Sequence, residues 1–154
     1  MKNIAFLIVI LNLTSASLIA QQHEKQYDSL LANQLDADAY GNSAYTFVML
    51  RTRSILEENK QIRDSLFAGH MANMGVMAEA GKLVLAGPFY TNNKDQFRGI
   101  FIINSTDTTE VRELLMADPA INFGLLQADL YPWYGSAALK LLNENHQRIQ
   151  KEDF

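Results

Sequence analysis

From residue 45 onward, the hydrophobic and polar positions of the chain follow two kinds of pattern. Short runs rich in β-branched and aromatic residues predict strands, and longer segments with apolar residues three or four apart predict helices. In chain order, the expected elements are a strand at 45–50, a helix at 60–80, strands at 83–86 and 99–103, a helix at 107–118 and a strand at 125–131. This βαββαβ order predicts a four-stranded antiparallel sheet with both helices on one face, an α+β sandwich of the ferredoxin-like kind.

Two of the predicted strands lack the alternation that a strand with one solvent-facing side shows. The segments YTFVML at 45–50 and GIFII at 99–103 are apolar on both faces. The helices cover only one face, so the sequence predicts a homodimer whose sheets pack against each other. The alternative is that the polar segment at 21–44 or the C-terminal helix at 137–150 folds over the second face.

The first twenty residues have the three-part layout of a secretory signal peptide. One cation, Lys2, precedes the apolar run at 4–11, and small and hydroxylated residues continue to Ala20. Cleavage is expected after Ala20, with Ser17 as the second candidate. The apolar core is shorter than the ~20 residues of a membrane-spanning helix, so a retained anchor is less favoured. The lysine and the candidate cleavage sites make a buried N-terminal strand or helix less favoured as well. The sequence therefore predicts a periplasmic or secreted protein without membrane contact after cleavage.

Length and composition fit one soluble domain. The chain has 154 residues, of which 48% are hydrophobic and 19% charged. The patterns divide it into a signal peptide at 1–20, a polar segment with a short helix at 21–44, the ferredoxin-like domain at 45–135 and a helical tail at 136–154.

Charge and motif content exclude several classes of function. The 13 Lys and Arg residues against 17 Asp and Glu residues give a net charge of −4, which becomes −5 when removal of 1–20 takes away Lys2. Because no basic block is present, nucleic acid is not an expected partner. The chain has no cysteine, no GxSxG, P-loop or GxGxxG motif and no histidine pair at zinc-ligand spacing. We therefore expect no metal and no cofactor, while an enzyme without such motifs stays open.

Two polar residues fall on the apolar stripes of the predicted helices. His70 lies within the stripe of the first helix, where a lone histidine is more often structural than functional. Asp118 takes the next position of the stripe in the second helix, where its carboxylate would oppose the macrodipole at a cost of about 0.3–1 kcal/mol. Alternatively, Asp118 and Pro119 are the N-cap and first residue of a short turn at Pro119–Phe123. The stripe of the first helix consists of Ile62, Leu66, His70, Met74 and Met77.

The predicted topology brings His70 and Asp118 within reach of each other. The two helices are expected to be antiparallel neighbours, so the end of the second lies beside the first. A carboxylate on one ring nitrogen fixes the tautomer and leaves the other nitrogen free to move protons. Such a pair is the minimal unit for general acid/base catalysis.

The chain contains the short motifs His70-Met71-Ala72-Asn73-Met74, Gly81-Lys82-Leu83, Ala86-Gly87-Pro88-Phe89, Arg98-Gly99 and Ala117-Asp118-Pro119 with Gly124. In these motifs it resembles the YCII-related (YciI-like) domain family over about residues 27–139. A subgroup of that family also has the C-terminal motif YPWYGSAAL, here at 131–139, and the segment ADAYG, here at 37–41.

The resemblance implies a dimeric α/β barrel in which His70 and Asp118 form the active-site dyad. Related barrels include muconolactone isomerase-like proteins and a dehydrochlorinase of chlorinated hydroxyquinols, which act on small cyclic compounds by proton transfer without a cofactor. The chain differs from the shortest members by its export signal and by a longer insert at 54–62.

Four further residues are candidates for ligand binding around the dyad. Gly87 and Pro88 end a strand and let backbone approach a ligand, although a simple turn is the alternative. Arg98 can hold an anionic group or lie in solvent at a strand start. Trp133 can stack a ring or fill a dimer interface.

These features support two hypotheses. In the first, the chain is a cofactor-independent lyase, isomerase or hydrolase acting on a small, including cyclic, molecule, with His70 as general base and acid and Asp118 orienting it. In the second, it is a non-catalytic protein that binds a small ligand or another protein, and the dyad is a structural hydrogen bond.

Overall fold

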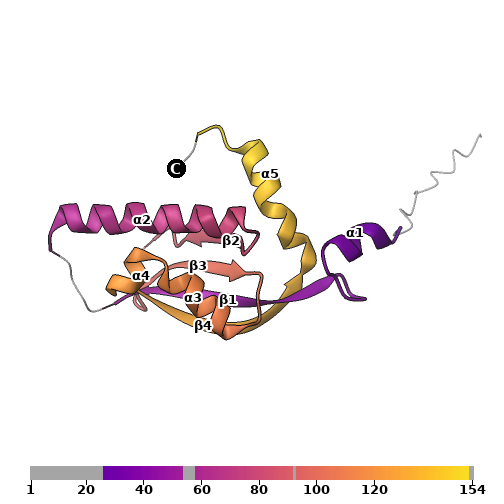
Figure 1. The fold of residues 1–154 in the computed structure, drawn as a ribbon, viewed down its shortest axis with the longest axis horizontal. Helices are drawn as coiled ribbons and strands as arrows, with labels where there is room; N and C mark the ends of the chain where they lie inside the picture. The colour runs from indigo at the N-terminus through magenta and orange to yellow at the C-terminus, as the bar shows by residue number, and fades with distance from the viewer. Residues whose placement is uncertain (1–25, 54–57, 92, 153–154) are drawn as a thin grey trace, which may run out of the picture.

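The computed structural model describes residues 26–53, 58–91 and 93–152, and the predicted signal peptide with both cleavage sites lies outside them. The described part shows the predicted βαββαβ order, with helices added at both ends (Figure 1). No helix in this part is both long and apolar enough to cross a membrane. The elements are α1 Ser29–Gln34, β1 Asn42–Thr52, α2 Lys60–Glu79, β2 Leu83–Pro88, β3 Phe97–Ile103, α3 Thr108–Met116, α4 Pro119–Phe123, β4 Leu126–Ser136, the 3₁₀ helix η1 Ala137–Leu141 and α5 Leu142–Ile149.

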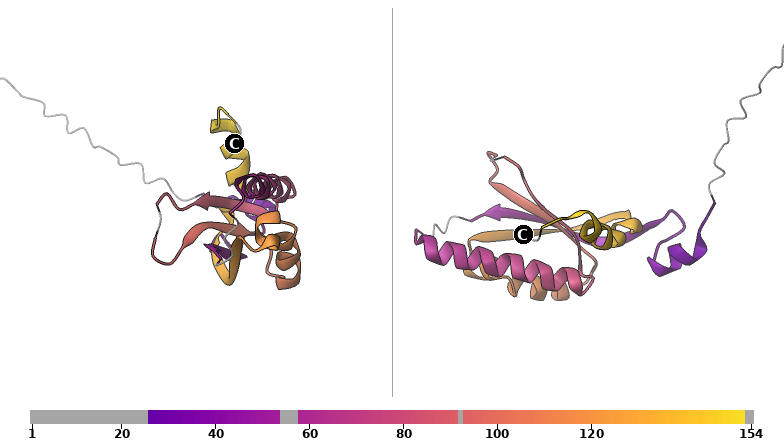
Figure 2. Two further views of the ribbon diagram at one scale, coloured as in Figure 1. Left: turned by 90° about the vertical axis from the view of Figure 1, so that its left-hand side faces the viewer. Right: turned by 90° about the horizontal axis from the view of Figure 1, so that it is seen from above.

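The four strands form one antiparallel sheet in the order β2-β3-β1-β4. β1 and β3 are central, so Val48 of β1 lies between Phe101 of β3 and Leu130 of β4. Helices α2, α3 and α4 lie together on one face of this sheet (Figures 1 and 2). The predicted fold class, α+β with ferredoxin-like topology, is confirmed.

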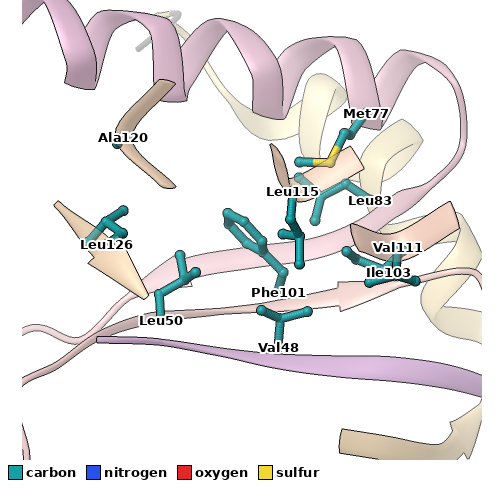
Figure 3. Close-up of a cluster of buried hydrophobic side chains, with 10 residues drawn as sticks. All are labelled: Val48, Leu50, Met77, Leu83, Phe101, Ile103, Val111, Leu115, Ala120 and Leu126. Carbon is teal, nitrogen blue, oxygen red and sulfur yellow. The ribbon is translucent and has the colours of Figure 1, made fainter. Parts of the chain in front are cut away.

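A cluster of buried apolar side chains fills the space between the sheet and these helices (Figure 3). Full burial of a Val, Leu, Ile, Phe or Met side chain contributes about 1.5–3 kcal/mol, so the cluster holds the helices on this face. The buried residues of α2, His70 and Met77, lie in its second half, whereas Ile62 is 41% exposed. The predicted stripe is therefore confirmed only from the middle of the helix onward. The cluster consists of Val48, Leu50, Met77, Leu83, Phe101, Ile103, Val111, Leu115, Ala120 and Leu126.

The last strand and the C-terminal helix differ from their predicted bounds. β4 continues through Pro132-Trp133-Tyr134, where we expected it to end. Pro132 lacks an N–H, but β4 is an edge strand that pairs with β1 alone, so the proline leaves the ladder intact. The C-terminal segment begins with η1 and becomes α-helical only at Leu142.

The second face of the sheet is covered at one end only. Tyr45, Val84 and Ile102 are buried there, and Leu139 of η1 packs against them. The C-terminal segment thus covers part of this face, as the alternative interpretation required. Farther along the same face, Tyr131 remains 47% exposed.

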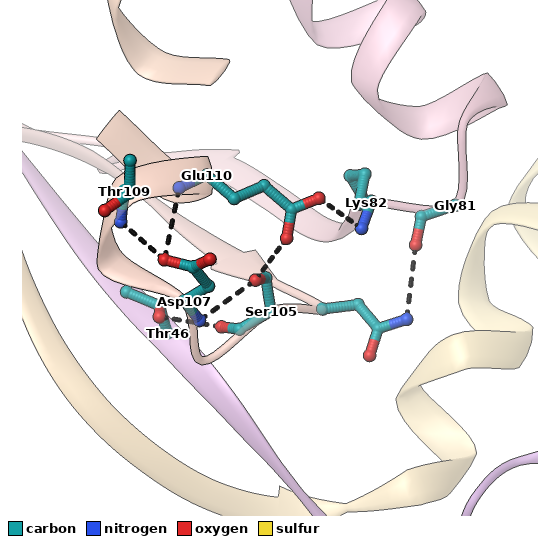
Figure 4. Close-up of polar contacts among 8 residues, drawn as sticks. Thr46, Gly81, Lys82, Ser105, Asp107, Thr109 and Glu110 are labelled. Atoms are coloured by element: carbon teal, nitrogen blue, oxygen red, sulfur yellow. Dashed lines mark hydrogen bonds and ion pairs between the residues drawn. The ribbon is translucent and has the colours of Figure 1, made fainter. Parts of the chain in front are cut away.

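Asp107 caps the start of α3, but Glu110 does not complete a capping box with it. Asp107 accepts hydrogen bonds from the backbone N–H groups of Thr109 and Glu110 (Figure 4). The Glu110 carboxylate does not return to the Asp107 N–H; it accepts from Lys82 Nζ and Ser105 Oγ, both at 2.5 Å. The Lys82 ammonium group is a stronger hydrogen-bond partner for a carboxylate than the backbone N–H of Asp107. Glu110 therefore joins α3 to the start of β2.

This contact makes stability depend on pH in the acidic range. The hydrogen bond from Lys82, followed by that from Ser105, lowers the pKa of Glu110. A lowered folded-state pKa contributes stability that is present above the ordinary carboxyl range and lost as pH falls through the folded value. We expect Glu110→Gln to be less stable than the wild type at pH 7, and the difference in unfolding free energy to be smaller near pH 3, in urea titrations. An equal difference at both pH values would contradict this assignment.

Candidate active site

The His70 ring lies between α2 and the centre of the sheet. It is 8% exposed, stacks on Phe101 of β3 with ring centroids 5.9 Å apart, and forms a T-shaped contact with Phe67 at a centroid distance of 6.3 Å. These contacts fix the ring plane through packing on two sides. An imidazole held in this way needs a hydrogen-bond partner for each nitrogen that water does not reach.

Asp118 supplies the partner for one nitrogen. It is 0% exposed, and its Oδ2 lies 2.5 Å from His70 Nδ1. Its Oδ1 accepts the backbone N–H of Ala120 at 2.9 Å and that of Ile121 at 3.4 Å, which makes Asp118 the N-cap of α4. The prediction that the two residues meet is confirmed.

The structure decides between the two interpretations of Asp118. α3 ends at Met116, and Asp118 begins α4 with Pro119 as its first residue. The carboxylate therefore lies at a helix N-terminus, where the backbone dipoles stabilise it. The prediction that it opposes the dipole in the last turn of a helix is wrong. The cap and the histidine contact coexist because each uses a different carboxylate oxygen.

The second ring nitrogen is available for a further hydrogen bond. A carboxylate only accepts, so Nδ1 carries the proton that it donates to Asp118. Nε2 of the neutral ring then holds a lone pair, and it has no hydrogen-bond partner within residues 26–53, 58–91 and 93–152. This arrangement can take up a proton at Nε2 and release it again.

The close approach of α2 and α4 depends on Gly69, which our sequence analysis missed. A Cβ at Gly69 would lie 2.6 Å from Pro119 Cγ, closer than any real contact. Gly69 precedes His70 and Pro119 follows Asp118, so this glycine–proline contact sets the separation of the two dyad residues. The signal in the sequence was a glycine inside a helix. It lowers helix stability by about 1 kcal/mol relative to alanine, which indicates that close packing requires it.

Pro88 and Arg98 lie together at the end of the β2–β3 hairpin, where they line a cavity of about 440 Å³ with four further residues, none of which belongs to the dyad. Gly87 precedes Pro88, and an added Cβ there would meet nothing within 4 Å. The tight backbone approach is at Gly99, where a Cβ would lie 2.7 Å from the Gly87 carbonyl oxygen.

Trp133 is on the other side of the sheet from His70. Its ring packs on Tyr45 at 5.7 Å and lies over Gly135, where an added Cβ would collide with it. One chain therefore does not bring Trp133 to the dyad, and its role in binding stays a prediction.

The segment ADAYG and the C-terminal motif YPWYGSAAL meet in space. The Tyr134 hydroxyl donates to the Asp38 carboxylate, which also accepts the backbone N–H groups of Tyr40 and Asn42. This hydroxyl, more than the backbone donors, lowers the pKa of Asp38. The contact ties the loop before β1 to the end of β4. In the part of the chain that the structure describes, no three His, Asp or Glu side chains gather as metal ligands would.

Comparison with known proteins gives the family. No curated protein matches the chain. Among solved structures, the chain is similar to 5-chloro-2-hydroxyhydroquinone dehydrochlorinase from Burkholderia phenoliruptrix, in complex with 2,5-dihydroxybenzoquinone, with 22% identity and a TM-score of 0.42 over 57% of this chain and 92% of that chain. The family model of the YCII-related domain matches residues 46–133, more than half of the sequence, and the chain therefore belongs to the YCII-related domain family.

Proposed function

We propose that the chain is a cofactor-independent enzyme that transfers protons on a small molecule, with His70 as the reacting base and acid. The observation that carries this proposal is the 2.5 Å contact between His70 Nδ1 and Asp118 Oδ2, with Nε2 lacking a hydrogen-bond partner among the residues that the structure describes. A histidine with a purely structural role is expected to have both buried ring nitrogens hydrogen-bonded within the protein.

In the proposed reaction, Nε2 removes a proton from an acidic C–H or O–H group of the substrate. The electron pair stays on the substrate as an enolate or phenolate, and the ring becomes an imidazolium. Asp118 stabilises this cation through the Nδ1–H hydrogen bond. Return of the proton to another substrate atom gives isomerisation, and loss of a leaving group from the anion gives elimination.

A small cyclic enol lactone provides a direct test. α-Angelica lactone changes into its conjugated isomer by moving one proton, and ultraviolet absorption follows the change. We expect the wild type to accelerate this isomerisation and His70→Ala to remove the acceleration while the circular dichroism spectrum stays unchanged. Equal rates for both proteins across a panel of such lactones and cyclic enones would favour the second function, in which the chain binds a ligand without converting it.

We also propose that two chains pair through the second face of the sheet. This face carries half-buried apolar side chains around Tyr131, which is 47% exposed, and Trp133, which is 37% exposed. Contiguous apolar surface of this kind marks an interface. The half-buried members are Phe47, Leu85, Met49 and Ile100.

A charge placed on this face is expected to separate the chains. Ile100 lies next to Met49 in the register of β1 and β3, at the centre of the sheet. We expect Ile100→Glu to convert a dimer into a folded monomer in sedimentation velocity, because an unpaired buried carboxylate costs several kcal/mol at a packed interface. Ser65→Glu, on exposed α2, is the matched control. A wild type that sediments as a monomer at high concentration would refute the pairing.

We place the protein outside the cytoplasm on the basis of the signal-like layout of residues 1–20. N-terminal sequencing of the protein from a bacterial periplasm tests this, with Gln21 or Leu18 as the expected first residue.

A further inference from the structure

A second recess lies on the side of α2 that does not carry the dyad. It is a groove of about 1190 Å³, bounded by α2, by β2 at the edge of the sheet and by α5. Figure 1 shows α5 rising away from the sheet beyond the end of α2. The hydrogen bond from Asn143 Nδ2 to the Leu83 carbonyl, at 2.6 Å, joins the start of α5 to β2 beside the groove.

The two sides of the groove differ in chemistry. The α2 and β2 side is apolar, with small residues at 68, 72 and 75 and methionines at 71 and 74. The α5 side is mainly polar and carries His146 and Arg148, with Leu142 and Ile149 as its apolar members. No acidic residue lines the groove, although the whole chain has 17 acidic residues against 13 basic ones. The groove is therefore apolar along one wall and cationic along the other in an otherwise acidic protein.

Gly75 gives an independent indication that something approaches α2 at this place. Glycine inside a helix costs about 1 kcal/mol relative to alanine. Gly69 has a packing reason for that cost, because its Cβ would strike Pro119, but a Cβ at Gly75 would meet nothing within 4 Å. The protein's own packing does not require this glycine, and exposed helix backbone beside an open groove suits the close approach of a ligand.

Most guanidinium N–H groups of Arg148 have no acceptor in the part of the chain that the structure describes. Its Nη1 donates to Asn145 Oδ1 at 3.3 Å within α5. A guanidinium with free donors recognises a carboxylate through paired hydrogen bonds.

From these observations we infer that the groove between α2 and α5 binds a small amphipathic carboxylate, with its apolar body along α2 and its carboxylate at Arg148. This site goes beyond the proposed function, since none of its lining residues belongs to the dyad. Charge complementarity selects an anion, and the apolar wall selects an alkyl or aryl body over a purely polar ion.

Decanoate is the probe for the test, with hexanoate and decyltrimethylammonium as matched comparisons. Amide chemical shifts in nitrogen-15 NMR report binding and its location. We expect decanoate to shift signals of α2 and α5, hexanoate to bind at least tenfold more weakly because it buries less apolar surface, and decyltrimethylammonium not to bind there.

Two variants locate the site. Gly75→Leu adds a side chain that fills the groove and favours the helix, so we expect decanoate binding to be lost in a folded protein. Arg148→Gln is expected to weaken binding about tenfold, as loss of a charged hydrogen bond does. Ser65→Leu adds the same leucine to exposed α2 outside the groove and should leave binding unchanged.

Three outcomes would overturn the inference. One is decanoate binding that survives Gly75→Leu. Another is equal binding of the cationic amphiphile, which would show a merely apolar surface. The third is that the same amide signals shift with protein concentration alone, which would assign the groove to a second copy of the chain.

Discussion

Replacing Asp118 by asparagine is expected to preserve the fold and to abolish proton transfer at His70. Asparagine is as good an N-cap as aspartate, so its Oδ1 can keep the bond from the Ala120 N–H and α4 remains capped. Its amide NH₂ then faces His70 Nδ1. Because an NH₂ group donates, Nδ1 must accept, and the ring proton moves to Nε2.

A ring that carries its proton at Nε2 cannot use that atom as a base. An equivalent exchange of carboxylate for amide beside a catalytic histidine lowers the rate by about 10⁴-fold with intact geometry. We expect a loss of this order for the lactone isomerisation in Asp118→Asn, with a change in unfolding free energy below about 1 kcal/mol in urea.

Asp118→Ala separates the structural role from the chemical one. Loss of the N-cap costs about 1 kcal/mol, and an unpaired buried Nδ1–H costs about 1–3 kcal/mol more. We therefore expect Asp118→Ala to lose about 2–4 kcal/mol of stability, whereas Asp118→Asn loses activity alone.

The tautomer can be read without any substrate. Nitrogen-15 shifts of the His70 ring at alkaline pH distinguish a proton on Nδ1, expected in the wild type, from one on Nε2, expected in Asp118→Asn. A wild-type ring protonated at Nε2 would contradict the assigned roles of both residues, whatever the activity.

Most of the fold could be predicted because its signals are local. The start of α3 at Asp107 and the left-handed residue at Gly81, with φ of 68°, follow from single residue types at helix ends. The end of β4 could not be predicted in the same way. Whether Pro132 stops a strand depends on its position in the sheet, which only the strand order decides.

The dyad could be anticipated, but not the shape of its surroundings. Helix periodicity and topology were enough to bring His70 and Asp118 together. It was not predicted that one oxygen of Asp118 caps α4 while the other contacts His70. The sequence supported the cap and the histidine contact as separate interpretations. Trp133 was a candidate for the dyad pocket because its ring can stack on a ligand, but the period of two along β4 places it on the other face of the sheet.

Gly69→Ala is expected to disturb the dyad without touching either member. The new Cβ would lie 2.6 Å from Pro119 Cγ and 3.2 Å from its Cβ, so α2 and α4 must move apart. Overpacking of this kind costs about 1–3 kcal/mol. The same movement displaces His70 from Asp118, and a misplacement of about 1 Å lowers catalysis about 10²-fold.

Gly75→Ala provides the matched control in the same helix. Both substitutions gain the same helix propensity of about 1 kcal/mol, but the Cβ at position 75 meets no other atom. The difference in unfolding free energy between the two variants therefore measures the contact with Pro119 alone. We expect Gly75→Ala to be more stable than the wild type and Gly69→Ala to be less stable than Gly75→Ala by about 1–3 kcal/mol.

Removing the proline ring tests whether this contact sets the spacing of α2 and α4. In the double variant Gly69→Ala/Pro119→Ala the Cγ and Cδ atoms that meet the new Cβ are absent, so a coupling energy of about 0.5–3 kcal/mol should appear between the two sites. Additive effects would show that α2 and α4 are not held apart by this contact. Recovery of both activity and stability in the double variant would show that the Gly69–Pro119 contact sets the spacing of α2 and α4. That spacing would then fix the distance between His70 and Asp118.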